Sequence, residues 1–218
     1  LCLVAPVSMR INPDVDAKTH AYIATGKKEN KFGIAYDDAL TSYQRAAQYP
    51  HLKIVGIDCH IGSQITELAP FLNAFERVME LKQNLTQAGV EINHIDLGGG
   101  LGVRYENEDV PAIEDYVAQI TQRLDTSTTQ LMFEPGRSIV ANAGVLLTKV
   151  EFLKHGESKN FAIVDGGMND LIRPALYQAY HQIAAVQPRP GNQSRYDIVG
   201  PVCESGDFFG KDRDFCLQ

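Results

Sequence analysis

The sequence lacks several features that would each define a class of protein. It has no basic excess, because 20 Lys and Arg residues stand against 27 Asp and Glu residues and the formal net charge is −7. That balance argues against a nucleic-acid-binding surface, which needs a basic stripe. No apolar run approaches the length of a membrane span. Neither an internal repeat nor a low-complexity tract is present, so we predict an ordinary globular protein in the cytoplasm.

Cysteine is also scarce. The four cysteines, Cys2, Cys59, Cys203 and Cys216, match neither a zinc-binding pattern nor the disulfide framework of a small secreted domain. We therefore expect reduced thiols and no metal site. The apolar start, residues 1–7, is short and lacks the basic flank of a signal peptide. We interpret it as the middle of a longer protein entering a strand.

Strand-like and helix-like segments alternate over the first two-thirds of the sequence. Strands are predicted at residues 7–11, 52–59, 94–97 and 130–134, and helices at residues 38–48, 70–87 and 111–124. Pro111 is placed in the first turn of the last helix, where proline is tolerated. Repeated strand–helix order implies parallel strands joined by crossover helices. Because no Rossmann motif begins the series, we predict an α/β fold, a partial (β/α)8 TIM-like barrel.

The pattern changes after about residue 142. Predicted strands at residues 145–152, 161–164, 181–186 and 196–199 follow one another without long helices. We therefore divide the chain into a barrel domain, residues 1–142, and a mostly β domain, residues 143–218.

Each predicted barrel strand ends in a polar or glycine-rich motif. The motifs are Arg10-Ile11-Asn12-Pro13, Cys59-His60-Ile61-Gly62-Ser63-Gln64, Asp96-Leu97-Gly98-Gly99-Gly100 and Glu134-Pro135-Gly136-Arg137. In barrels the chemistry lies at the carboxyl ends of the strands. The four motifs therefore predict an active site at this end of the barrel.

The run Gly98-Gly99-Gly100 can bring backbone N–H groups close to an anion, since no side chain blocks the approach. Taken alone, it predicts a structural turn equally well. Gly136 follows the next strand, and paired loops after neighbouring late strands are the usual phosphate site of a barrel. The two loops together favour a phosphate-binding site.

Three further residues at strand ends have a chemical interpretation beside a structural one. Glu134 should lie at the barrel mouth, partly out of water. It either forms a salt bridge with an arginine or keeps a ring nitrogen protonated, which makes a pyridine ring a stronger electron sink. His60 is either a structural residue or an imidazole that covers a planar ring. Ser63 places a hydroxyl within reach of a phosphate.

The second domain contributes two candidate groups. Arg173 and Tyr177 are four residues apart and would share a helical face, where the arginine can bind a carboxylate bidentately. The alternative is an exposed arginine and a core tyrosine. Cys203, in Cys203-Glu204-Ser205-Gly206-Asp207, is either a small buried apolar side chain or a proton donor beside an acidic residue.

Jointly, the motifs at His60, Gly98, Glu134 and Cys203 resemble those of the barrel-type, fold type III pyridoxal-phosphate decarboxylases. Within that family they most resemble the branch that acts on diaminopimelate, over essentially the whole chain. Residues 12–20, 31–33 and 168–174 add to the resemblance. It implies pyridoxal 5'-phosphate as cofactor and the conversion of meso-2,6-diaminopimelate to L-lysine, the last step of lysine biosynthesis.

The resemblance also implies a role for each cofactor-binding residue. His60 would stack on the cofactor ring, and Glu134 would pair with the pyridine nitrogen. The phosphate would be held by Ser63, Gly100 and the backbone of Gly136 and Arg137. The same loops also contain Gly98, Gly99 and Pro135.

Substrate recognition and proton transfer are implied in the same way. Arg137, Arg173 and Tyr177 would bind the distal carboxylate of the substrate, and Glu204 its distal ammonium. Cys203 would protonate the carbanion left after carbon dioxide departs, which makes it catalytic together with His60 and Glu134. In the family the Cys203 loop reaches the active site of the partner subunit, so a homodimer with shared active sites is implied.

The lysine that carries the cofactor in this family, on an early strand, has no counterpart here. Lys53 begins its strand and would point to the wrong end of the barrel, and no tyrosine-containing loop follows Cys203. We therefore expect a fragment, incomplete at both ends and inactive alone. The alternatives are an ornithine- or arginine-type decarboxylase, disfavoured by Arg173 and Tyr177, a racemase, disfavoured by Glu134, and a non-catalytic relative without the lysine.

Overall fold

The computed structural model of the chain describes residues 3–17, 25–26 and 30–217. Two compact units make up the chain. The barrel unit is Leu1–Arg104 with Glu108–Ala143, and the β unit is Tyr105–Asn107 with Gly144–Gln218. The residues Cys2, Lys18, Thr19 and His20 lie outside the described residues. Each unit has its own buried core.

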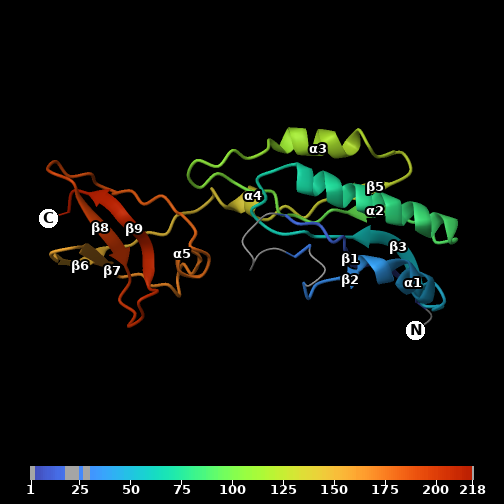
Figure 1. The fold of residues 1–218 in the computed structure, drawn as a ribbon, viewed down its shortest axis with the longest axis horizontal. Coiled ribbons are helices and arrows are strands. Elements are labelled where there is room, and N and C mark those ends of the chain that lie inside the picture. The colour runs from blue at the N-terminus through green and yellow to red at the C-terminus, as the bar shows by residue number, and fades with distance from the viewer. Residues whose placement is uncertain (1–2, 18–24, 27–29, 218) are drawn as a thin grey trace. The chain divides into compact units, whose positions relative to one another are not determined.

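The barrel unit is built on a five-stranded parallel sheet with the order β2-β1-β3-β4-β5 (Figure 1). Its strands are β1 (Ala5–Asn12), β2 (Ile34–Ala35), β3 (Leu52–Asp58), β4 (His94–Asp96) and β5 (Gln130–Met132). The parallel order confirms the predicted partial barrel. The sequence pattern misses β2, because two residues are too few to show alternation.

The described residues of this unit form four helices, namely α1 (Tyr36–Ala46), α2 (Ala69–Gln87), α3 (Ile113–Thr121) and α4 (Arg137–Val140). α1 contacts α2 and α2 contacts α3, so the helices follow the order of the strands (Figure 1). The predicted start of α3 at Pro111 is wrong. The helix begins at Ile113, which puts Glu114 and Asp115 in its first turn, where carboxylates stabilise the helix dipole.

Helix α2 supplies many of the apolar side chains that cover this sheet. Its buried residues recur at helical spacing and include Phe71, Ala74, Phe75, Val78, Leu81 and Leu85. They form one cluster with Ile57 of β3 and Ile95 of β4. Full burial of such a side chain contributes about 1.5–3 kcal/mol. The strand ends that carry the motifs therefore rest on a closely packed layer.

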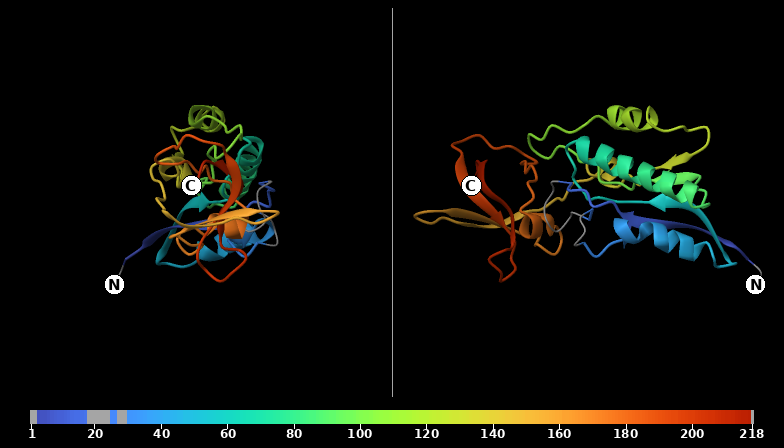
Figure 2. Two further views of the ribbon diagram at one scale, coloured as in Figure 1. Left: turned by 90° about the vertical axis from the view of Figure 1, so that its left-hand side faces the viewer. Right: turned by 45° about the vertical axis from the view of Figure 1, so that its right-hand side comes forward.

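The β unit contains a four-stranded sheet, whose ribbon is seen in Figure 2. Its strands have the order β6-β7-β8-β9. Its elements are β6 (Val150–Lys154), β7 (Asn160–Val164), α5 (Arg173–Tyr177), β8 (Ser194–Val199) and β9 (Phe208–Phe215). The predicted mostly β character of this part is confirmed. No helix in the described part of the chain is long and apolar enough to cross a membrane.

Three details predicted for the β unit are wrong. Strand β6 begins at Val150 rather than at residue 145, and residues 181–186 form no strand. Ile183 in that segment packs on the core of the β unit from a loop, which explains its apolar pattern. The sequence pattern misses β9, because charged residues in the second half of the strand hide the alternation of apolar and polar side chains. The backbone of this strand is also irregular, since Asp212 has a positive φ of 53°.

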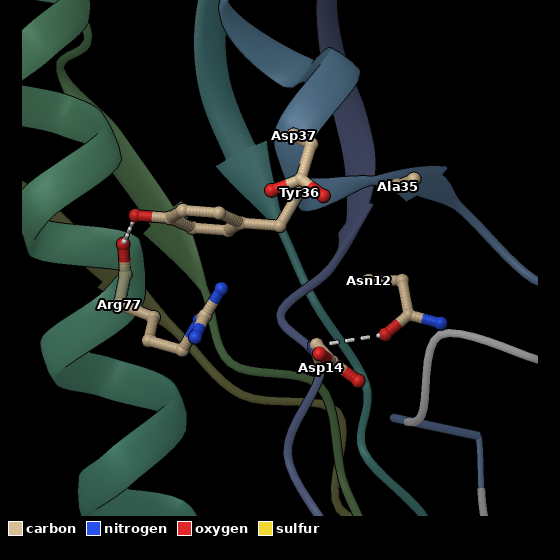
Figure 3. A pocket seen from close by; sticks show the side chains of 6 residues that line it. All are labelled: Asn12, Asp14, Ala35, Tyr36, Asp37 and Arg77. Atoms are coloured by element: carbon tan, nitrogen blue, oxygen red, sulfur yellow. Dashed lines mark hydrogen bonds between the residues drawn. The ribbon is translucent and has the colours of Figure 1, made fainter.

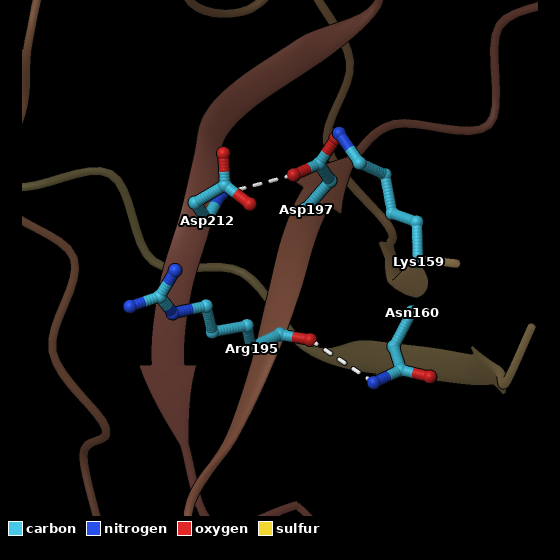
Figure 4. A network of polar contacts seen from close by, with 5 residues as sticks. All are labelled: Lys159, Asn160, Arg195, Asp197 and Asp212. Carbon is cyan, nitrogen blue, oxygen red and sulfur yellow. Dashed lines mark hydrogen bonds and ion pairs between the residues drawn. The ribbon is translucent and has the colours of Figure 1, made fainter. Parts of the chain in front are cut away.

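A buried carboxylate joins β8 to β9 and to the residue that precedes β7 (Figure 4). Asp197 of β8 is 5% exposed and forms an ion pair with Lys159 Nζ at 2.9 Å. It also accepts a hydrogen bond of 2.9 Å from the Asp212 N–H. Asn160 Nδ2 donates to the Arg195 carbonyl oxygen at 3.1 Å. The contact with Asp212 fixes β9 at the residue whose backbone is left-handed.

Tyr43 of α1 holds the two central strands of the barrel unit where their register is irregular. Its side chain is fully buried, and its hydroxyl lies 2.9 Å from the Gly56 carbonyl oxygen and 3.2 Å from the Met9 carbonyl oxygen. The pairing of β1 with β3 shifts between Val7 and Ser8, next to these carbonyls. Burial raises the pKa of Tyr43, so the hydroxyl remains a donor.

The Tyr43→Phe variant should lower the free energy of unfolding by about 1–3 kcal/mol, because it leaves buried carbonyl groups without their hydroxyl donor. Urea denaturation measures the loss. Tyr49→Phe is the matched control, since Tyr49 is 50% exposed, and it should leave the midpoint unchanged. Equal midpoints for the two variants would contradict the role of Tyr43.

Candidate active site

The carboxyl ends of the parallel strands bring charged residues into one layer. Arg10 of β1 is in register with Asp58 of β3, and Asp58 is in register with Asp96 of β4. β5 lies beside β4, and Glu134 follows it. The motifs that are separate in the sequence are therefore neighbours at one end of the sheet, where barrel enzymes place their chemistry.

His60 follows β3 and lies against the glycine loop. The Gly99 N–H donates to His60 Nδ1 across 3.1 Å. Partial burial lowers the pKa of His60, and the positive charge of Arg10 lowers it further. The imidazole is therefore neutral at pH 7, with its proton on Nε2. A neutral planar ring is suited to cover another planar ring.

The glycine loop packs too closely against its neighbours to admit side chains. A Cβ on Gly99 would collide with the Glu134 carbonyl oxygen. A Cβ on Gly100 would collide with the Gly62 carbonyl oxygen. Gly98 and Gly100 also have φ values of +67° and +109°, which L side chains rarely adopt. The glycines therefore allow the loops after β3, β4 and β5 to touch.

Two of the three backbone N–H groups in the glycine run already donate to acceptors within the protein. The Gly98 N–H donates to Asp96 Oδ1 at 2.8 Å, and the Gly99 N–H donates to His60. Gly98 also accepts at its carbonyl oxygen a hydrogen bond of 2.8 Å from the Glu134 N–H. The first two glycines therefore use their polar groups within the protein, and they serve close packing rather than direct anion binding.

Donors for a phosphate are present in each of the three loops. Among the described residues, the Gly100 N–H, the Gly136 N–H and the Ser63 hydroxyl have no acceptor. All three lie in the loops after β3, β4 and β5. They are the groups that the family resemblance assigns to the phosphate of pyridoxal phosphate. The residues present therefore fit that cofactor.

Carboxylates surround this end of the sheet. The pKa of Asp58 is raised to about 6, first by burial and then by the negative charges of Asp96 and Glu134, against the effect of Arg10. Glu134 itself is exposed, so the prediction that it lies partly out of water is wrong. It follows β5, which is an edge of the sheet, and no described strand covers the far side of that edge.

Arg137 begins α4, directly after the exposed residues Pro135 and Gly136. Its Nη1 donates to Gln64 Oε1 at 2.9 Å. Gln64 in turn forms two hydrogen bonds with Val103, which follows the glycine loop. Arg137 is thereby connected to the loops after β3 and β4.

In the β unit, Arg173 and Tyr177 share one face of α5. The Arg173 guanidinium carbon lies 5.9 Å from the centroid of the Tyr177 ring and 5.1 Å from that of the Tyr105 ring. Arg173 Nε is buried and has no hydrogen-bond partner among the described residues. A buried guanidinium nitrogen without an acceptor is consistent with an arginine that binds an anion.

Cys203 and Glu204 are exposed in the loop between β8 and β9, which excludes the interpretation of Cys203 as a buried apolar residue. The loop is held by Asp207, which is 3% exposed. Its carboxylate accepts hydrogen bonds from the Val202 N–H at 2.7 Å and the Met168 N–H at 2.6 Å. One buried side chain therefore joins this loop to the segment that precedes α5.

A pocket near the end of β1 contains none of the predicted site residues (Figure 3). It is lined by Asn12, Asp14, Ala35, Tyr36, Asp37 and Arg77. The Arg77 guanidinium carbon lies 4.1 Å from the centroid of the Tyr36 ring, and the Tyr36 hydroxyl donates to the Arg77 carbonyl oxygen at 3.0 Å. Asn12 Oδ1 accepts from the Asp14 N–H at 3.0 Å. None of the six lining residues belongs to the loops after β3, β4 and β5.

Comparison with known families agrees with the geometry. A family model described as "Pyridoxal-dependent decarboxylase, pyridoxal binding domain" matches residues 2–141. The chain therefore belongs to the pyridoxal-dependent decarboxylases, and the cofactor of this family is the one that the motifs predict.

Its relatives confirm the predicted resemblance. The chain is 62% identical to the diaminopimelate decarboxylase of Pseudomonas aeruginosa, over 98% of this chain and 51% of that protein. It is 58% identical to the diaminopimelate decarboxylase of Vibrio cholerae, over 98% of this chain and 52% of that protein. A crystal structure of diaminopimelate decarboxylase from Helicobacter pylori complexed with L-lysine has a TM-score of 0.93 at 44% identity, and the match covers 99% of this chain and 54% of that one. The chain thus spans about half the length of the curated relatives it matches.

Sequence reasoning gives no role to five residues that the structure connects to the predicted site. They are Arg10, Asp58, Gln64, Asp96 and Asp207. Each lies inside a motif or directly before one, and that position is the only feature of the sequence that could have indicated a role for it. Their partners are distant in sequence, so the contacts themselves could not be read from the motifs.

The Asp58→Asn variant should change how stability depends on pH. The fold keeps Asp58 protonated up to about pH 6, whereas the unfolded residue titrates near 3.8. Between these values the native state binds more protons, so the free energy of unfolding falls as the pH rises. The asparagine variant lacks this loss, and its stability relative to the wild type should increase from pH 4 to pH 7. Urea denaturation at several pH values measures the difference, and a constant difference would contradict the raised pKa.

Proposed function

We propose that the protein containing this chain removes carbon dioxide from meso-2,6-diaminopimelate to give L-lysine, with pyridoxal phosphate as cofactor. The observation that carries the proposal is the meeting of a neutral His60, the glycine loop and Glu134 at one end of a parallel sheet. The names of the relatives, which are diaminopimelate decarboxylases, support the choice of substrate.

The barrel unit supplies the cofactor site. When bound, pyridoxal phosphate supplies a protonated pyridine ring that withdraws electrons from the reacting carbon of the substrate. Ser63, Gly100 and Gly136 hold the phosphate through the donors that have no acceptor in the described protein. His60 covers one face of the ring, and Glu134 keeps a proton on the ring nitrogen.

Recognition of the second amino-acid head group distinguishes diaminopimelate from simpler diamino acids. Arg137, Arg173 and Tyr177 bind the distal carboxylate, and Glu204 binds the distal ammonium. The buried Arg173 Nε supports this assignment, because it lacks an acceptor among the described residues. A desolvated charge pair contributes on the order of several kcal/mol of discrimination, so an amine tail without a carboxylate is bound poorly.

The reaction ends with a proton transfer. The departing carbon dioxide leaves an electron pair on the substrate carbon, and the Cys203 thiol donates its proton to that carbon. Cys203 is exposed on a loop that Asp207 holds, as a group that meets a substrate must be. We assign this loop to the active site of a partner subunit, so the active protein is a homodimer. The unpaired thiols Cys59, Cys203 and Cys216 are compatible with a reducing cytoplasm.

A decarboxylation assay on the full-length protein tests the proposed function. With pyridoxal phosphate present, meso-2,6-diaminopimelate should release carbon dioxide and give lysine, whereas ornithine should react far more slowly. Equal or faster turnover of ornithine would overturn the assignment of the substrate, and no turnover of either would overturn the assignment of the reaction.

The Glu134→Gln variant should lower kcat by about 10²–10³-fold, because the amide cannot stabilise a protonated ring nitrogen. The affinity for pyridoxal phosphate, measured by absorbance titration, should change much less. Glu114→Gln in the first turn of α3 is the control and should retain normal turnover. An unchanged kcat for the Glu134 variant would refute the role at the ring nitrogen.

The Cys203→Ala variant should slow turnover by about 10²–10⁴-fold, which is the usual contribution of a general acid. Steady-state formation of lysine measures the effect. Cys216→Ala is the matched control in the β unit. A near-normal rate for Cys203→Ala would mean that another group delivers the proton.

A further inference from the structure

Gln64 connects the three loops that follow β3, β4 and β5. Its Nε2 donates to the Val103 carbonyl oxygen at 2.6 Å, and its Oε1 accepts from the Val103 N–H at 3.1 Å. The same Oε1 accepts from Arg137 Nη1 at 2.9 Å. One side chain therefore satisfies two backbone groups of one loop and a guanidinium on another.

The orientation of this amide is fixed by its partners. The Val103 carbonyl oxygen requires a donor, so the NH2 group of Gln64 must face it. The amide oxygen then faces the Val103 N–H and Arg137 together. A reversed amide would place two donors against each other on the Arg137 side, so the arginine always meets the oxygen.

The backbone conformation at Gln64 is consistent with a functional role for this residue. Its φ is +57°, a left-handed conformation that is costly for a residue other than glycine and that clusters at functional sites. Glycine would adopt this conformation without strain. The neighbouring Ile65 pairs with the next loop, because its N–H donates to the Gly100 carbonyl oxygen at 2.9 Å and its carbonyl oxygen accepts from the Gly102 N–H at 2.9 Å.

We propose that Gln64 is a positioning residue that aims the Arg137 guanidinium at the distal carboxylate of the substrate, an inference that rests on the proposed function. A neutral amide suits this task, because it orients the guanidinium without adding a negative charge beside it. A carboxylate at the same position would neutralise Arg137 and repel the Val103 carbonyl oxygen. Gln64 thus determines specificity through Arg137 without touching the reacting carbon.

Gln64→Gly tests the proposal, since it removes the amide and suits the left-handed backbone. L-Lysine is the probe, because it retains the distal carboxylate and undergoes no decarboxylation as the product of the proposed reaction. In the full-length holoenzyme, calorimetry should show lysine binding about tenfold to a hundredfold weaker than in the wild type, the scale of a lost charge-assisted contact. The affinity for pyridoxal phosphate should remain close to that of the wild type, whereas the urea midpoint should fall, because the Val103 N–H and carbonyl oxygen lose their side-chain partner.

Gln64→Glu is the second variant, and it should weaken lysine binding at least as much because it cancels the charge of Arg137. Gln83→Glu is its matched control on an exposed position of α2 and should bind lysine normally. Unchanged lysine affinity in both Gln64 variants would overturn the inference. An equal loss of lysine and cofactor affinity would also overturn it, because it would indicate a structural role. Failure of the wild-type holoenzyme to bind lysine would instead refute the proposed function on which the inference rests.

Discussion

The close approach of three loops is the constraint on which the candidate site depends. The loops after β3, β4 and β5 touch at Gly98, Gly99 and Gly100, where a Cβ would strike backbone or an imidazole. Side-chain contacts then become possible between residues far apart in sequence. His60 receives a hydrogen bond from Gly99, and Glu134 joins Gly98 through its own N–H. Without this packing, the same motifs would occupy three unrelated loops.

Charge within this layer is regulated by the environment of each group. Burial and the charge of Arg10 lower the pKa of His60 and keep its imidazole neutral. Burial and the two carboxylates of Asp96 and Glu134 instead raise the pKa of Asp58 to about 6. Asp96 uses one oxygen to fix the Gly98 N–H. The charge of each group in this layer therefore depends on the groups that the fold places beside it.

The sequence predicts the barrel strands well, because their apolar runs are short and end in turn residues. It predicts the β unit less well, since β9 contains a charged half and a left-handed Asp212. The chemical motifs were visible because they follow the ends of successive predicted strands, where barrel enzymes place their chemistry. The connection of Gln64 to Arg137 spans 73 positions, so no local pattern could reveal it. The exposure of Glu134 follows from its place at a sheet edge, which depends on the order of all the strands.

The loop that carries Cys203 is exposed, yet its backbone is held at Val202 by the buried carboxylate of Asp207. Ordering a loose segment when a ligand binds costs conformational entropy, about 1–2 kcal/mol for each residue. Here folding itself already orders the backbone beside Cys203. A small ligand has few contacts with which to offset such a cost, so preorganisation of this kind matters most for compact polar molecules. Any molecule that meets this loop therefore meets backbone that Asp207 has already ordered.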